Sequence, residues 1–498
     1  MSYRTASEAW TKLEGKRSGL LTRVERYAAL TIPKVCLPSG VTRENTDETH
    51  DYQSIGAQAA NHLSNKLMLA MFAPSRPFAK LVPGDKLKAE LQKLKLTQTQ
   101  LDQVLANGER EAIRALDGKA QRPVLFQIMR HLIITGNVLL FLGKDKLRYH
   151  GLRNYVVRRD IQGRVKTLVI QEKVCFDELD PDVVALFRNR YQDDSEVSFY
   201  KWIQRDSDGK YKLTQWVDEY KLPAKYDGSW SEEKLPYRVL TWDLADESDY
   251  GTGLVEEYAG DLEAASVLSE AIVDGAVLGA EFRWMVNPNG VTQVEDLNNS
   301  ENGDSLPGLP TDVAPTQGGN PTAITVAESV LDRYERRISR GFLMGSAVIR
   351  DAERVTQEEV RLTATELETA YGGVYSTLAA TLQLPVARWL FDSIDLQLGQ
   401  ADLQVTVVTG LDALSRSGDL ENFRLAMGDA ASVANTPESL QQRLKWSEIA
   451  QFIGQGRNID FTRFLLNEQE ISEQQNAAAA SRVEEAVVTQ AGTAAVQG

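Results

Sequence analysis

The sequence predicts an α+β fold that is mainly helical, and two observations predict it. Toward both ends of the chain, apolar residues recur every three or four positions over long stretches, which is the spacing of amphipathic helices. Between residues 137 and 242 the period changes to two, with glycine-containing turns, which is typical of antiparallel strands. We therefore expect an antiparallel sheet that packs against N-terminal helices, followed by a set of long helices.

The N-terminal half supplies the helices that are expected to cover this sheet. Ile32-Pro33 ends the first of them and Pro74 the second, while Pro123 suits the first turn of the last. The predicted helices span 6–30, 53–72, most of 85–116, and 123–135. Predicted strands span 78–82, 138–141, 155–157, 167–170 and 197–200. The predicted hairpin turns are Gln162-Gly163 and Asp208-Gly209.

Two long helices, predicted at 252–281 and 322–344, carry opposite charge. Five carboxylates of the first fall within about 40° of one another at helical spacing, and they form an acidic stripe: Glu256, Glu263, Glu270, Asp274 and Glu281. Four arginines of the second group within about 100° as a basic stripe: Arg333, Arg336, Arg337 and Arg340. The stripes are either two solvated faces, or they meet, or one of them lines a channel.

The segments that join and follow these helices are irregular. The insert 282–321 is expected to begin with a strand at 282–286, to hold a short helix or strand at 291–297, and to project from the fold. The loop 345–355 ends in Thr356, which with Glu359 has the form of a capping box. A third long helix, predicted at 356–393, is weakened by Gly372-Gly373 and kinked by Pro385. A strand at 403–408 and helices at 420–433, 437–452 and 459–469 precede an Ala- and Gln-rich tail.

Length, charge and cysteine content limit the function classes. The chain has 498 residues, a net charge of −15 and two cysteines, Cys36 and Cys175. Two cysteines are too few for a disulfide framework or a Cys-based zinc site. The acidic balance disfavours tight binding of nucleic acid, although DNA could pass without sticking. No apolar run reaches ~18 residues, so we expect no membrane-spanning helix. Met1-Ser2-Tyr3-Arg4 leads directly into a polar helix, so we expect no signal peptide.

Motifs in series along the chain resemble the portal, or head-to-tail connector, proteins of short-tailed, podovirus-type bacteriophages. The resemblance extends in order over residues 10–465. The motifs that carry it include Thr135-Gly136-Asn137, Tyr250-Gly251-Thr252-Gly253, Val286-Asn287-Pro288, Glu353-Arg354-Val355-Thr356 and Leu382-Gln383-Leu384-Pro385.

The resemblance implies a viral portal fold assembled as a ring, with named regions. The wing would comprise 1–247 and, with a long kinked helix, 356–435. The stem helices would be 248–281 and 322–344, and the clip between them 282–321. The tunnel loop would be 345–355, the crown 436–471, and the C-terminal tail 472–498.

The same resemblance implies the role and the partners. Twelve subunits would form a ring at one capsid vertex, through which double-stranded DNA is packaged by the terminase motor and later ejected. The ring would join head to tail and nucleate procapsid assembly. The large terminase subunit and a tail adaptor would bind the clip, the major capsid and scaffold proteins the wing, and internal core proteins the crown. The protein would belong to the virion, and to the host cytoplasm during assembly, with no membrane partner.

The resemblance also places a DNA-facing tunnel loop, whose candidate residues are Gly345, Ser346, Arg350, Asp351, Glu353 and Arg354. Arg350 and Arg354 would contact phosphate, and the two carboxylates would offset their charge. We expect the arginine face to pair with a neighbouring subunit and the acidic face to be partly exposed to the lumen.

No motif supports an enzyme. No G-x-x-x-x-G-K-[ST] loop occurs, Gly251-Thr252-Gly253 is interpreted as a helix-entry turn, and no pair of carboxylates stands out for acid/base catalysis. His62 and His131 are expected to be satisfied structural histidines. We therefore expect no catalytic residue, metal or cofactor. The alternatives are a nuclease or packaging ATPase subunit, and an internal scaffold protein without a pore.

Overall fold

The computed structural model describes residues 3–41, 52–73, 78–84, 98–317, 321–345, 357–394 and 403–407. The chain divides into two compact units, residues 1–410 and 411–498, and all of the described residues belong to the first. Several predictions lie outside them: the helices at 420–433, 437–452 and 459–469, the crown, the tail, and the capping box at Thr356.

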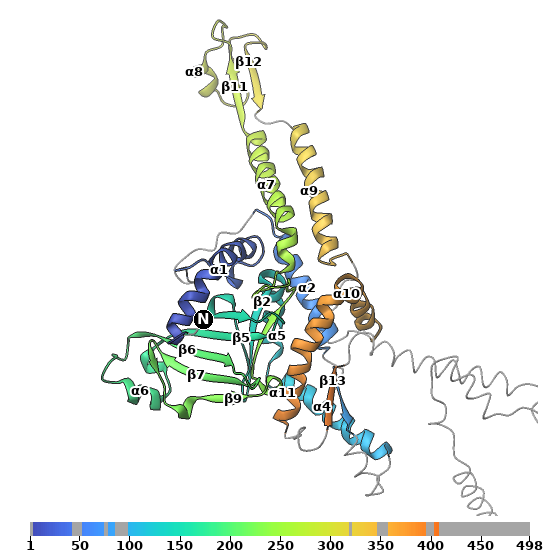
Figure 1. Cartoon of the computed structure of the whole chain (residues 1–498). Helices are drawn as coiled ribbons and strands as arrows, with labels where there is room; N and C mark the ends of the chain where they lie inside the picture. The colour runs from blue at the N-terminus through green and yellow to red at the C-terminus, as the bar shows by residue number, and fades with distance from the viewer. Residues whose placement is uncertain are drawn as a thin grey trace, which may run out of the picture. The chain divides into compact units, whose positions relative to one another are not determined.

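The four helices predicted in the N-terminal half are present, and they lie around the sheets of the body (Figure 1). They are α1 (Ala6–Ala29), α2 (Ile55–Met71), α4 (Gln98–Gly118) and α5 (Arg122–Thr135). The Thr5 hydroxyl caps α1 by accepting from the Glu8 N–H at 3.1 Å. The apolar stripe of α2, including Leu63, Leu67 and Met71, is buried. A further strand, β1 (Ala79–Pro83), pairs antiparallel with β13 (Leu403–Val407), and the sequence predicted both strands but not their pairing.

The prediction of a single antiparallel sheet between residues 137 and 242 is wrong, because the strands of this region form two sheets. The larger has the order β4-β5-β6-β7-β8, with β9 also on β7, and the smaller has the order β10-β2-β3. The larger sheet consists of β4 (Tyr155–Arg159), β5 (Val165–Cys175), β6 (Glu196–Arg205), β7 (Tyr211–Val217), β8 (Tyr220–Lys221) and β9 (Gly228–Trp230). The smaller consists of β2 (Asn137–Leu142), β3 (Leu147–His150) and β10 (Tyr237–Thr241). A short helix, α6 (Pro181–Phe187), was not predicted.

Arg17 of α1 binds the segment that joins the two sheets. Its side chain is fully buried, and its guanidinium donates to the carbonyls of Leu152, Arg153 and Tyr155. These carbonyls lie between the end of β3 and the first residue of β4, and the buried guanidinium supplies their hydrogen-bond donors. The predicted turns are confirmed, because Gly163 and Gly209 take φ of 75° and 76°, which favours glycine.

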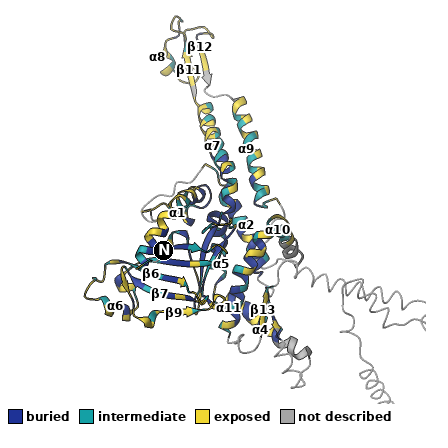
Figure 2. Ribbon diagram, viewed as in Figure 1, coloured by how far each residue is buried: buried dark blue, intermediate teal, exposed yellow. Residues whose placement is uncertain are grey.

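The long helices are also confirmed. α7 (Leu254–Ala280) leads to a hairpin of β11 (Phe282–Val286) and β12 (Val313–Gln317), with the short helix α8 (Val294–Asn298) between the strands. α9 (Pro321–Gly341) returns beside α7 (Figure 1). Figure 2 shows buried residues concentrated in the body, whereas the distal parts of α7 and α9 and the hairpin are mostly exposed.

The third long helix is interrupted near both predicted weak points. α10 (Gln357–Leu378) breaks at Tyr371, whose φ of −134° and ψ of 35° are not helical, and this residue precedes Gly372-Gly373. A π-helical stretch, Ala379–Gln383, then precedes α11 (Leu384–Ser393), which has Pro385 in its first turn. A wide turn accommodates a proline that cannot donate to the preceding turn. Among the described helices, none is long and apolar enough to cross a bilayer.

Candidate functional site

The first long helix begins at a junction made by two of the sequence motifs. The Asn137 side chain donates to the Gly251 carbonyl at 2.6 Å and to the Thr135 carbonyl at 2.8 Å, and it accepts from the Gly251 N–H at 2.8 Å. Gly136 has a φ of 71°, and its carbonyl accepts from the Trp242 N–H. The helix-entry interpretation is therefore confirmed: the start of α7 is bound to the end of α5.

Glycine is required at this junction because backbone approaches backbone. A Cβ placed on Gly253 would lie 2.7 Å from the Ile133 carbonyl oxygen and 2.8 Å from the Gly136 nitrogen. The residues just before the glycines cover the free edge of β4, since the Tyr250 hydroxyl accepts from the Val157 N–H at 3.0 Å. Sequence reasoning used Asn137 only as part of a motif, although a Thr-Gly-Asn turn between a helix and a strand already pointed to a backbone-binding side chain.

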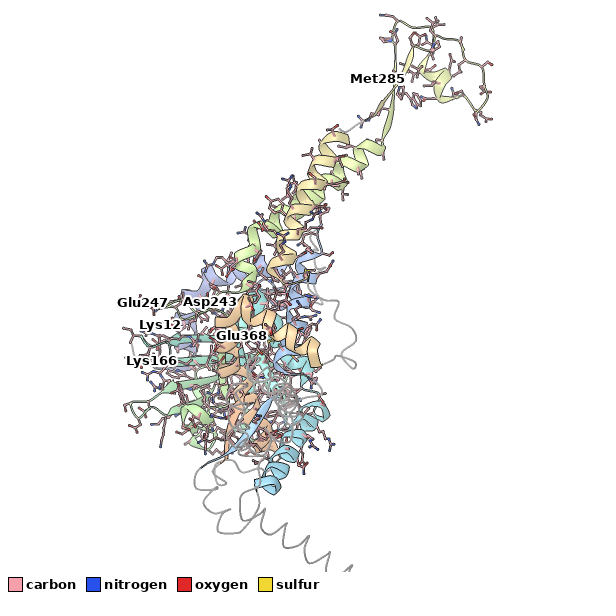
Figure 3. All side chains as sticks on the ribbon, turned by 90° about the vertical axis from the view of Figure 1, so that its right-hand side faces the viewer. Lys12, Lys166, Asp243, Glu247, Met285 and Glu368 are labelled. Atoms are coloured by element: carbon pink, nitrogen blue, oxygen red, sulfur yellow. The ribbon has the colours of Figure 1, made fainter. Side chains whose placement is uncertain are left out.

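α7 and α9 lie side by side along their length, which Figures 1 and 3 show from two directions. At the body end, the rings of Tyr258 and Phe342 pack edge to face at 5.3 Å. Asp261 binds Arg337 close by. Toward the hairpin, a Cβ on Gly275 would lie 3.3 Å from Ile324, so a residue without a side chain allows close packing there.

The acidic stripe of α7 faces α1 rather than α9 at the body end. Arg23 lies 3.9 Å from Glu256, and the Arg26 guanidinium donates to Glu263. Farther along, the negative charge of Glu270 and a hydrogen bond to it raise the pKa of the Tyr52 hydroxyl. Asp274 is exposed, and Glu281 is exposed and lies 3.4 Å from Arg283.

The basic stripe of α9 is exposed at all four arginines. Arg337 reaches Asp261, which is not part of the acidic stripe, and Arg336 lies 3.7 Å from Asp332 one turn earlier. Arg333 and Arg340 have no ion pair within the described ranges. Within the described residues, no arginine of the basic stripe pairs with a carboxylate of the acidic stripe, because the one arginine that reaches α7, Arg337, binds Asp261 instead.

The distal half of the helix pair exposes apolar side chains. Val267, Val273, Val277 and Leu278 of α7 are 64%, 49%, 56% and 49% exposed, whereas Leu262, closer to the body, is fully buried. In β11, Trp284 and Met285 are 58% and 62% exposed, and Met285 is labelled in Figure 3. Neighbouring residues of a strand point to opposite faces, so both faces of a two-stranded hairpin carry a large apolar side chain. Large exposed apolar patches are typical of surfaces that bind another protein, a membrane or a ligand.

The predicted tunnel loop is described only at its first residue, Gly345, which is exposed. The other candidates, Ser346, Arg350, Asp351, Glu353 and Arg354, lie outside the described residues.

His62 and His131 lie on helices of the body, as expected, and their surroundings suggest no ligand-binding role. His62 Nε2 lies 3.1 Å from the Leu343 carbonyl oxygen, which can only accept, so the ring donates from Nε2. Burial lowers the pKa of His131 to about 4, so this ring is neutral at pH 7. His131 Nδ1 has no hydrogen-bond partner within the described ranges, so the prediction of a satisfied histidine is wrong at that atom. The described part of the chain contains no group of three or more His, Cys, Asp or Glu that could hold a metal ion.

Comparison with known proteins gives relatives along nearly the whole chain. The portal protein of Enterobacteria phage SP6 is 31% identical over 495 residues, which cover 98% of this chain and 95% of that relative. The portal protein of Escherichia phage T7 is 31% identical over 480 residues, covering 93% and 89%. That of Pseudomonas phage phiKMV is 31% identical over 491 residues, covering 96% and 95%. These relatives bear the name of a portal protein and not of an enzyme.

A solved structure titled as the neck of a native gene transfer agent particle, computed with C12 symmetry, is also similar. It is 13% identical, has a TM-score of 0.34, and covers 78% of this chain and 97% of its own. At that TM-score the likeness carries no conclusion about this chain.

The family model described as bacteriophage head to tail connecting protein matches residues 3–462. Together with relatives that are 31% identical over almost their full length, this match shows that the chain belongs to the family of bacteriophage head to tail connecting proteins.

Proposed function

We propose that copies of this chain close into a ring at one capsid vertex, and that double-stranded DNA passes through it during packaging and ejection. The observation that carries the proposal is the pair α7–α9, which extends beyond the body and exposes apolar side chains along its distal half. In a monomer, Val273 and Val277 would leave apolar surface in contact with water, which is unfavourable. Neighbouring copies in a ring would bury these side chains.

The charge pattern of the pair supports a head-to-tail arrangement. One side carries the acidic stripe, of which Glu256 and Glu263 face α1, and the other side carries four exposed arginines, of which Arg337 reaches Asp261 of α7. Identical subunits that meet through two different, complementary surfaces close into a ring when the rotation between them allows it. The basic side of one copy would then face the acidic side of the next.

The finer roles are part of the same proposal. By resemblance to the family, the ring has twelve subunits, the β11–β12 hairpin is the clip that binds the terminase motor and a tail adaptor, and the wing meets capsid and scaffold proteins. The role is structural, with nucleotide hydrolysis left to a separate motor. The protein would be part of the virion, and of the host cytoplasm during assembly.

The variant Val273→Asp/Val277→Asp is expected to abolish rings. Each aspartate would place a charge where a neighbouring copy must pack, and burying an unpaired charge is strongly unfavourable. Light scattering after size exclusion and negative-stain images measure the outcome: annular particles for the unmodified chain, and single subunits for the variant.

The matched control is Ile161→Asp, because Ile161 is 91% exposed at the β4–β5 turn of the body. The control should assemble like the unmodified chain. An unmodified chain that stays monomeric under all conditions, or a Val273→Asp/Val277→Asp variant that still forms rings, would contradict the proposal.

A second variant, Arg350→Ala/Arg354→Ala, tests the proposed contact of the tunnel loop with phosphate. Rings should form normally, while DNA retention or packaging changes, because two cations are lost from a surface that faces the nucleic acid. Loss of ring assembly would instead show that these arginines hold the subunits together.

A further inference from the structure

A buried lysine of α2 binds a backbone carbonyl just after the end of α9, nearly three hundred residues later in the sequence. Lys66 of α2 is 2% exposed, and its ammonium donates to the Leu343 carbonyl and to Glu366 of α10, both at 2.7 Å. His62, one turn earlier on α2, donates to the same Leu343 carbonyl. One cation therefore connects α2, the end of α9 and the first half of α10.

Leu343 has an unusual backbone conformation at this point. Its φ is +57°, in the left-handed region that usually holds glycine after a helix. Its N–H bonds to the Arg340 carbonyl, and the Met344 N–H bonds to the Ser339 carbonyl, which together form a Schellman motif. A leucine persists in this conformation only when its surroundings hold it. Here two side chains of α2 bind its carbonyl.

The neighbouring carbonyl is held in the same way. The Tyr371 hydroxyl donates to the Gly341 carbonyl, and Tyr371 is the residue at which α10 departs from helical geometry. The last carbonyls of a helix have no partner within it and carry partial negative charge. A buried ammonium at this end is therefore favoured by the helix dipole as well as by Glu366.

We propose that Lys66 is a positioning residue that fixes the end of α9 relative to α10. Residues 343 and 366 lie on either side of the connection 345–355, so one side chain links the end of α9 to the first half of α10, the two helices that this connection joins. The inference rests on the proposed function, because in a ring the same brace would hold each copy's connection at the same place. Lys66 showed no sequence signal beyond its position on an apolar helix.

Replacing Lys66 by methionine tests the brace without changing the length of the side chain much. Paired spin labels at Gly345→Cys and at Arg114→Cys, on the exposed side of α4, report where the end of α9 lies relative to the body. The background is Cys175→Ser, since Cys36 is buried and burial raises the pKa of its thiol, which slows labelling. Labelled chains are mixed with an excess of unlabelled chain, so that the measured distances lie within one subunit and not between subunits.

The unmodified background should give one narrow distance peak by pulsed electron paramagnetic resonance, and Lys66→Met should shift or broaden it. The matched control is Arg17→Met, which also removes a buried cation bound to carbonyls, but these belong to residues 152–155 and not to the end of α9. It should lower the melting temperature and leave the peak unchanged. If Lys66→Met gives no folded protein, Glu366→Ala, at a side chain that is 30% exposed, makes the same test.

An unchanged peak in Lys66→Met or Glu366→Ala, or an equal change in Arg17→Met, would show that Lys66 only stabilises the body. Ring images of the unlabelled background decide the proposed function separately. An absence of rings there leaves the distance measurement in single chains valid.

Discussion

Gly253→Ala is expected to destabilise the protein by about 3 kcal/mol or more, at the upper end of the cost of overpacking. The new methyl group would lie 2.7 Å, 2.8 Å and 2.9 Å from backbone atoms of Ile133, Gly136 and Ile134. Backbone held on both sides by helix and strand cannot move aside as a flexible side chain could. The φ of −93° at Gly253 is one that alanine adopts, so the whole effect is steric. Chemical denaturation followed by circular dichroism measures it.

The control for this prediction is Gly260→Ala, in the interior of the same helix. A Cβ there meets no atom within 4 Å, and alanine is the better helix former by about 1 kcal/mol. This variant should raise the free energy of unfolding. If Gly253→Ala were as stable as the unmodified chain, α7 would not be fixed to α5 as the junction requires.

At this junction, the sequence predicts the helices but not the contacts between them. Apolar periodicity located α1, α2, α5, α7 and α9 to within a few residues, because apolar residues recur at helical spacing in each of them, whether the body buries them or, as in distal α7, leaves them exposed. It could not show that the Thr-Gly-Asn turn and the Tyr-Gly-Thr-Gly turn bind each other. Asn137 and Gly251 are 114 residues apart, and no local pattern reports such a contact.

The division of the sheet was missed for the same reason. β2 pairs with β10, about a hundred residues later, and the side chain that binds the carbonyls between β3 and β4 comes from α1. Period-two patterning identifies strands but not their partners. A buried Arg17 or Lys66 is equally invisible, since long basic side chains on a helix are usually exposed.

The charged stripes were predicted as patterns, and the structure adds their direction. Tyr258, Asp261 and Gly275 face α9, so the carboxylates on the other side of α7 cannot reach the arginines of the same chain. Arg333 and Arg340 have no ion pair in the part of the chain that the structure describes, and another copy or the passage itself could supply one. Two hypotheses for the arginine face can therefore be distinguished by experiment: it pairs with a neighbouring copy, or it lines the passage.

Reversing the charge of the arginine face is expected to prevent ring formation, and a complementary reversal is expected to restore it. In the variant Arg333→Glu/Arg336→Glu/Arg340→Glu, each copy would set glutamates against the acidic side of its neighbour. In the variant Glu270→Arg/Asp274→Arg, arginines would meet arginines. Like charges in contact across an interface cost several kcal/mol, so each variant alone should remain as single subunits by light scattering.

An equal mixture of the two variants should form rings in which they alternate. Every contact would again join a basic side to an acidic one, and a ring with an even number of subunits closes without a mismatched contact. The assembly should weaken as salt is added, because exposed charges are screened within about 8 Å at physiological ionic strength. If each variant forms rings alone but retains DNA abnormally, the arginine face lines the passage instead of joining subunits. A head-to-tail ring held by these stripes requires both outcomes together: failure of each variant alone and recovery of the mixture.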